Sequence, residues 1–198
     1  MYERQLIRAV ATLVLLVGVS LGAWADDFED GLAAADRGDY ATALRVWKPL
    51  AEQGDAWAQI NLGVLYEKGL GVAQNDIEAM HWYRLSARQG LPEAQNAIGL
   101  FYEGGYVTGN DTDAAKWYRL GAEQGYADAQ YNLGRMYYKG AGVPKDDVLA
   151  YMWLNLAAAQ GHANATIFRD GLAEASLSPA QIQEAQRLAR EWLEAHPQ

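Results

Sequence analysis

The chain has 198 residues, no cysteine and a net charge of −9 at pH 7, with 51% hydrophobic and 21% charged residues. This composition is typical of a globular protein and argues against wholesale disorder. The missing cysteines exclude disulfides, thiolate metal sites and cysteine nucleophiles. The negative charge argues against sequence-independent binding to nucleic acid and against attraction to an anionic membrane.

Residues 1–25 have the pattern of a secretory signal peptide. Arg4 and Arg8 make the start basic, residues 9–24 are uncharged and rich in Leu and Val, and Ala23-Trp24-Ala25 matches an A-x-A cleavage site. The uncharged stretch is shorter than the roughly 20 residues that a membrane span needs. We expect cleavage after Ala25 and a periplasmic or secreted mature chain that does not associate with the membrane. The alternative is an uncleaved anchor with the domain outside the cytoplasm.

A short phrase that ends in Gln-Gly returns along the rest of the chain. Its closing glycines are Gly54, Gly90, Gly125 and Gly161, at successive distances of 36, 35 and 36 residues. A Leu-Gly or Ile-Gly pair and a tryptophan return with the same step. Self-similarity at this period indicates a solenoid in which each unit packs on its neighbours.

Each unit has the pattern of two helices. In the first full unit, residues 56–68 place apolar side chains on one helical face. Gly63 lies inside this helix, where glycine costs about 1 kcal/mol relative to alanine. Because glycine recurs at this position in every full unit, we expect it to mark a close contact between helices. The second helix is predicted to begin near Asp76 and to end at Gly90, in the left-handed conformation that glycine favours.

The three full units resemble the Sel-one-like repeat, a longer-looped relative of the tetratricopeptide repeat. Their opening phrases are AQINLGVLYEKG, AQNAIGLFYEGG and AQYNLGRMYYKG. The resemblance implies an all-α fold, a right-handed α-α superhelical solenoid of helix-turn-helix repeats. It also implies a role as a scaffold or adaptor that binds other proteins.

The repeats predict an organisation in six segments. These are a signal peptide at 1–25, an N-terminal tetratricopeptide-like half repeat or capping repeat at 26–54, full repeats at 55–90, 91–125 and 126–161, and C-terminal capping helices at 162–198. In the last segment, Arg169 and Asp170 stand where the full units carry Leu-Gly or Ile-Gly. This change suits a capping unit with a polar outer face.

Patterns that carry catalysis or metal binding are missing from the sequence. The three histidines form no His-Glu-x-x-His pair, and we expect them to be solvated or to cap helices. No serine lies in a Ser-x-x-Lys or Gly-x-Ser-x-Gly motif. We therefore predict a protein without catalytic residues, metal or cofactor. The alternatives are a cell-envelope hydrolase, either β-lactamase-like or peptidoglycan-related, and a secreted effector that binds host proteins.

A binding groove is predicted on the concave side, which the first helices of such repeats line. The side chains that the core does not require there are Trp57, Ile60, Val64, Glu67, Asn96, Leu100, Glu103, Tyr131, Arg135 and Tyr138. Partial burial against a neighbouring helix is the alternative for Trp57 and Ile60. Because Trp, Tyr and Arg are favoured anchors at interfaces, we expect the groove of a monomeric protein to bind a protein or peptide. The aromatic groove residues predict a partner with apolar side chains, and the negative charges of Glu67 and Glu103 predict that it also carries Lys or Arg.

Overall fold

The structure is a computed structural model that describes residues 21–197, with side chains from Asp27 onward. This part of the chain consists of ten α-helices and contains no strand. Among these helices, none combines the length and the apolar character that crossing a membrane requires. The chain divides into two compact units, Met1–Leu91 and Pro92–Gln198. The predicted signal peptide lies outside the described residues, apart from residues 21–25 at the start of the first described helix.

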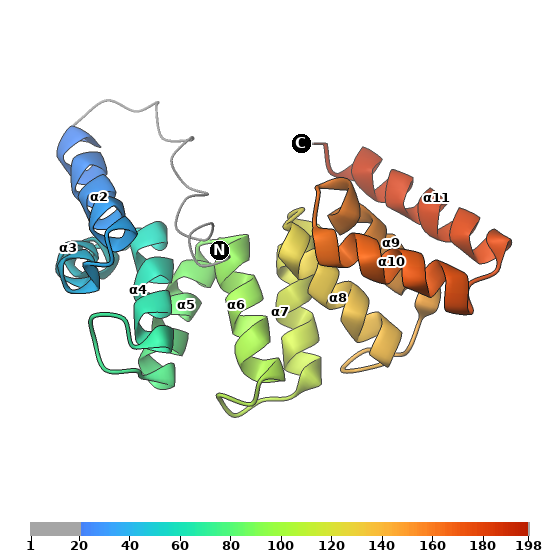
Figure 1. Cartoon of the computed structure of the whole chain (residues 1–198), viewed down its shortest axis with the longest axis horizontal. Coiled ribbons are helices and arrows are strands. Elements are labelled where there is room, and N and C mark those ends of the chain that lie inside the picture. The colour runs from blue at the N-terminus through green and yellow to red at the C-terminus, as the bar shows by residue number, and fades with distance from the viewer. Residues whose placement is uncertain (1–20, 198) are drawn as a thin grey trace. The chain divides into compact units, whose positions relative to one another are not determined.

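The first unit contains two consecutive helix pairs, α2–α3 and α4–α5 (Figure 1). The helix bounds are Leu21–Asp36 for α2, Tyr40–Glu52 for α3, Ala56–Lys68 for α4 and Asp76–Arg88 for α5. Helix α3 packs on α2 and on α4, and α4 packs on α5. Trp47 on α3 is buried, and its indole Nε1 donates a hydrogen bond of 3.2 Å to the carbonyl of Phe28 on α2.

The second unit contains six helices (Figure 1). Their bounds are Pro92–Glu103 for α6, Asp111–Glu123 for α7, Ala127–Lys139 for α8, Asp147–Ala159 for α9, Ala163–Ser176 for α10 and Pro179–Ala195 for α11. Helices α6 to α9 pack in order, each on the next. Helix α9 also contacts both α10 and α11, so it is the common support of the last two helices.

Local capping chemistry explains where the helices begin and end. The side chains of Asp55, Asn75, Asn110 and Asp146 accept hydrogen bonds from backbone amides in the first turn of the helix that follows each of them. Ser178 caps α11 in a reciprocal capping box, with proline as the first helical residue. The backbone φ of Gly90 is +94°, which confirms the predicted left-handed end of α5.

The glycine that recurs in the first helix of each repeat lies against an aromatic ring in the first two repeats. A Cβ atom at Gly63 would lie 2.4 Å from Cε1 of Tyr83, and one at Gly99 would lie 2.5 Å from Cε1 of Tyr118. Both rings are buried. The prediction that this glycine marks a close contact between helices is confirmed.

A glutamine just after the second helix of each full repeat bonds to a buried glutamine of that repeat's first helix. The side-chain amide of Gln89 donates to the carbonyl of Gly54 and to Oε1 of Gln59, both at 2.9 Å. The equivalent bonds to a buried glutamine are Gln124 to Gln95 at 2.8 Å and Gln160 to Gln130 at 2.9 Å. These bonds satisfy polar groups at the edge of the core, and leaving such groups unpaired would destabilise the fold.

We predict that Gly99→Leu destabilises the protein by about 1–3 kcal/mol, because the added side chain has to displace the buried ring of Tyr118. The free energy of unfolding from urea titration measures the effect. Gly171→Ala on α10 is the control, since no atom beyond the adjoining residues and the backbone of the same helix lies within 4 Å of a Cβ at that position. Alanine there is expected to raise stability by up to about 1 kcal/mol. Equal unfolding midpoints for Gly99→Leu and the wild type would contradict the close contact.

Candidate functional site

The predicted groove residues of the first unit all lie on α4. Trp57, Val64 and Glu67 are half-buried, whereas Ile60 is only 4% exposed. The prediction that Ile60 lines a groove is therefore wrong. Six consecutive residues of α4, 58–63, are buried, and helices α3 and α5 both pack on it.

The carboxylate of Glu67 is engaged within the first unit. It accepts a hydrogen bond of 2.5 Å from the hydroxyl of Tyr83. Burial, together with the charge and hydrogen bond of Glu67, raises the pKa of Tyr83, so this hydroxyl remains a neutral donor.

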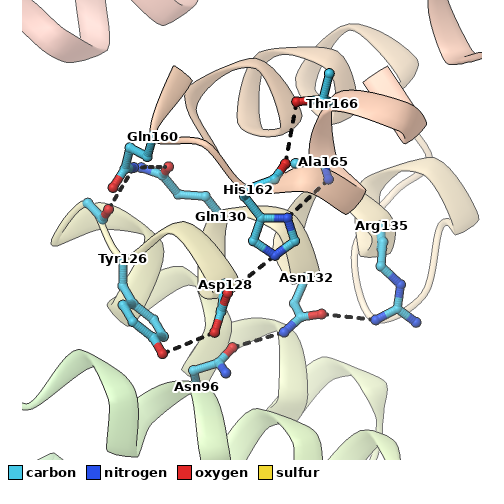
Figure 2. Close-up of polar contacts among 11 residues, drawn as sticks. Asn96, Tyr126, Asp128, Gln130, Asn132, Arg135, Gln160, His162, Ala165 and Thr166 are labelled. Atoms are coloured by element: carbon cyan, nitrogen blue, oxygen red, sulfur yellow. Dashed lines mark hydrogen bonds and ion pairs between the residues drawn. The ribbon is translucent and has the colours of Figure 1, made fainter. Parts of the chain in front are cut away.

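In the second unit, the predicted groove residues of α6 differ strongly in exposure. Leu100 is 45% exposed, but Asn96 is only 7% exposed. Oδ1 of Asn96 accepts a hydrogen bond of 2.9 Å from Nδ2 of Asn132, also a buried residue (Figure 2). The prediction of Asn96 as a groove residue is wrong, because its polar group pairs with α8 inside the fold.

Glu103 and Arg135 form a bridge between α6 and α8. Nη2 of Arg135 donates to Oε1 of Glu103 at 2.9 Å, and the other carboxylate oxygen accepts a bond of 2.8 Å from the hydroxyl of Tyr118. The side chains of Arg135 and Glu103 are 23% and 24% exposed. Burial and the charge of Glu103 raise the pKa of Tyr118. Most of the bonding capacity of Glu103 is therefore used within the protein.

The third repeat departs from the first two at the position of this glutamate. Tyr138 stands where the earlier repeats carry Glu67 and Glu103, and Leu154 stands where they carry tyrosines. Without a carboxylate and hydroxyl to pair, Tyr138 packs edge-on against Phe168 of α10, with ring centroids 5.0 Å apart. Tyr138 is 37% exposed.

An open hollow of about 400 Å³ lies between α8 and α10. The predicted groove residues Tyr131 and Tyr138 line it from α8. Its α10 side includes Ile167, Phe168 and Gly171, and Ile167 is 72% exposed. The hollow is therefore mostly apolar and accessible, which are the properties of a site for an apolar side chain.

Sequence periodicity does not predict the α10 side of the hollow (the α10 wall), because residues 162–198 lack the repeat phrase and their pattern favours only a capping role. The available signal was the pair of large apolar residues Ile167 and Phe168 beside the polar Arg169-Asp170 pair. Small Gly171 one turn after Ile167 leaves room beside them.

His162 joins the start of α10 to α8, as Figure 2 shows. Its Nδ1 accepts the backbone N–H of Ala165 at 3.0 Å, and its Nε2 lies 3.2 Å from Oδ1 of Asp128. The imidazole also stacks on the ring of Tyr131, with centroids 4.6 Å apart. The prediction that histidines serve as helix caps is confirmed for His162. In the described part of the chain, no three His, Asp or Glu side chains group in a way that could hold a metal ion.

Comparison with known proteins identifies the repeats. The family model of the Sel1 repeat matches residues 58–91, 92–126 and 127–162. The chain belongs to the Sel1 repeat family. Sel1 repeats generally mediate protein–protein interaction, and proteins of the family are typically non-catalytic scaffolds.

Two solved structures carry the same repeat fold. The Sel1 repeat protein from Oxalobacter formigenes is 43% identical, with a TM-score of 0.60 over 65% of this chain and 97% of that chain. A protective antigen of uropathogenic Escherichia coli that displays an SLR fold is 28% identical, with a TM-score of 0.51 over 87% of this chain and 46% of that chain. These similarities, with the helices described above, confirm the predicted all-α helical repeat solenoid.

The curated relatives are much longer than the matched segments. An F-box protein of Arabidopsis thaliana is 38% identical over 93 residues, which are 46% of this chain and 26% of that protein. The other two matches cover 10% and 12% of the relatives concerned. The similarity therefore concerns the repeats and not the whole of those proteins.

We predict that Arg135→Leu lowers stability by about 1–3 kcal/mol, because it removes charge-assisted bonds to Glu103 and Asn132 from a largely buried position. Urea unfolding measures the loss. Arg187→Leu on α11 is the control, because its ion pairs lie on the surface and are expected to contribute nothing measurable. Unchanged stability of Arg135→Leu would show that the arginine is not held by the fold.

Proposed function

We propose that this protein is exported and acts as a scaffold that binds a protein segment in the hollow between α8 and α10. The observation that carries the proposal is the exposure of Tyr138 and Ile167 on opposite sides of this hollow. Large apolar side chains that gather around a concavity are typical of interaction sites. The family to which the chain belongs supports a protein as the ligand.

The change in the third repeat supports the same location. In the first two repeats the position of Tyr138 is a glutamate that holds a buried tyrosine hydroxyl. In the third repeat this internal bond is absent, and an aromatic side chain is exposed instead. Aromatic side chains in concave surfaces are frequent anchors of protein–protein binding. We therefore place the anchor of the partner beside Tyr138.

The charges at the Tyr138 end of the hollow suggest the chemistry of the partner. The side chains of Lys139 and Lys145 are 52% and 59% exposed, and their amino groups lie 3.8 and 3.6 Å from the nearest carboxylates. The Lys145 amino group also lies 5.4 Å from the centroid of the Tyr138 ring. Both lysines remain accessible to a further anion.

We propose a partner segment with a large apolar side chain next to Asp or Glu. Glu103, which favoured a basic partner in the sequence, already binds Arg135 and Tyr118. The apolar side chain occupies the hollow, and the neighbouring carboxylate lies near the two lysines. Charge at the rim chiefly changes the association rate, so added salt slows binding modestly while the apolar anchor holds the complex.

The binding site is tested by photo-crosslinking in an envelope extract of the source organism. We expect p-benzoylphenylalanine in place of Ile167 to give a defined protein adduct, whereas the same probe in place of Leu193, an exposed residue of α11, gives none. Equal adducts from both positions, or none from Ile167, would remove the hollow as the site.

Gly171→Leu is the matching blocking variant. Beyond the adjoining residues and the backbone of the same helix, no atom lies within 4 Å of a Cβ at Gly171, so the leucine side chain fills the hollow without disturbing the helix. We expect the fold to be retained and the adduct at position 167 to fall by about thirtyfold, the effect of losing one strong anchor. Melting curves verify the fold. An undiminished adduct in a folded Gly171→Leu protein would contradict the proposed location.

Export is tested separately. We expect the mature protein in the periplasm or medium to begin at Asp26, as measured by intact mass. Ala23→Asp and Ala25→Asp alter the small residues that signal cleavage requires, and are expected to leave the precursor uncut. A full-length protein recovered only from the cytoplasm would overturn the export proposal without affecting the proposed binding site.

A further inference from the structure

The contacts of His162 select one tautomer of its neutral imidazole. The backbone N–H of Ala165 points at Nδ1, so this nitrogen has to offer a lone pair. The proton of the neutral imidazole therefore lies on Nε2, where it faces the carboxylate of Asp128. The side chain is 8% exposed, so water cannot readily replace either contact.

A protonated imidazole cannot keep this arrangement. With both nitrogens protonated, an N–H on Nδ1 would face the N–H of Ala165, and two donors do not bond. The positive end of the α10 dipole also disfavours a cation at the first turn. The first turn of α10 then loses its side-chain cap, whatever the strength of the remaining contact with Asp128.

The charged and titratable groups around His162 come from helix α8, from the residue before α8 and, through Asp128, from helix α6. Helix α8 contributes Asp128, Tyr131 and the guanidinium of Arg135, which lies 5.7 Å from the centroid of the Tyr131 ring. Asp128 also accepts a hydrogen bond of 3.1 Å from the hydroxyl of Tyr126, which precedes α8. Helix α6 contributes Glu93, whose pKa is raised by burial and by the charge of Asp128. Asp128 favours the imidazolium, while the cap and the helix dipole oppose it.

We propose that His162 is a positioning residue of the hollow, and that its protonation releases the start of α10 and weakens partner binding in acid. The link to the hollow is direct, because the imidazole stacks on Tyr131 and Asn164 follows in the first turn of α10, and both residues line the hollow. The second half of this inference rests on the proposed function. A segment bound to the neutral form dissociates when the imidazole gains a proton.

The first test follows the cap itself in the intact protein. Amide hydrogen exchange at Ala165 is measured by NMR at about pH 8 and about pH 5, which span the usual titration of histidine. We expect protection, corrected for the intrinsic pH dependence, to fall about fivefold in acid, as loss of a typical cap implies. The nitrogen shifts of His162 are expected to report the Nε2–H tautomer at the higher pH.

Two variants distinguish an effect of protonating His162 from an effect of protonating its neighbours. His162→Asn keeps a side-chain acceptor at the cap but cannot gain a proton, so its protection at Ala165 should not depend on pH. Glu93→Gln removes the other group expected to titrate nearby and should retain the response of the wild type. Constant protection in the wild type, or an equal loss in His162→Asn, would overturn the role of His162.

The second test repeats the crosslink from position 167 at the same two pH values. We expect the adduct to fall in acid by about fivefold in the wild-type background and to remain constant in His162→Asn. An adduct that is independent of pH in both backgrounds overturns the proposed release. Absence of the adduct at either pH refutes the proposed binding site instead, while hydrogen exchange still decides whether His162 controls α10.

Discussion

The close approach of two helices at a glycine is the constraint on which each repeat depends. The rings of Tyr83 and Tyr118 occupy the space that a Cβ would need at Gly63 and Gly99, so a larger residue at either position displaces a buried ring. Each tyrosine hydroxyl then reaches a glutamate at the end of the facing helix. The contact fixes the separation of the pair, and the hydrogen bond satisfies a polar group that burial would otherwise leave at a cost.

In the third repeat the two helices also come close at a glycine, but the tyrosine–glutamate hydrogen bond of the first two repeats is replaced. A Cβ at Gly134 would lie 2.9 Å from Cγ of Leu154, so an aliphatic side chain now fills the space of the ring. Because leucine has no hydroxyl, no glutamate is required opposite it, and Tyr138 occupies that position. The packing constraint is thus met by apolar atoms alone, which leaves the end of α8 available for a surface role. In the proposed function, the exposed Tyr138 gives the third repeat a binding site that the first two repeats lack.

The periodic features of the fold could be predicted from the sequence, whereas the contacts between repeats could not. The period of 35 or 36 residues predicted the helix pairs and the glycine contact, because both are local to one unit. Ile60 and Asn96 are buried because neighbouring helices cover more than one face of the helix that carries each residue. A pattern of apolar residues along a single face does not predict this burial. The bond from Arg135 to Glu103 spans 32 residues and depends on side-chain reach. The α10 wall carries no repeat phrase, so periodicity gave no signal for it.

The ring of Tyr131, which lines the hollow, has two different side chains as neighbours. Its ring has the guanidinium of Arg135 5.7 Å from its centroid and the imidazole of His162 stacked at 4.6 Å. The arginine is tied to Glu103 and Asn132, so the fold fixes its contact with the ring. The histidine is tied to a backbone amide through a lone pair that a proton would remove. Of these two neighbours of Tyr131, His162 is therefore the one through which we propose that acid acts on the hollow.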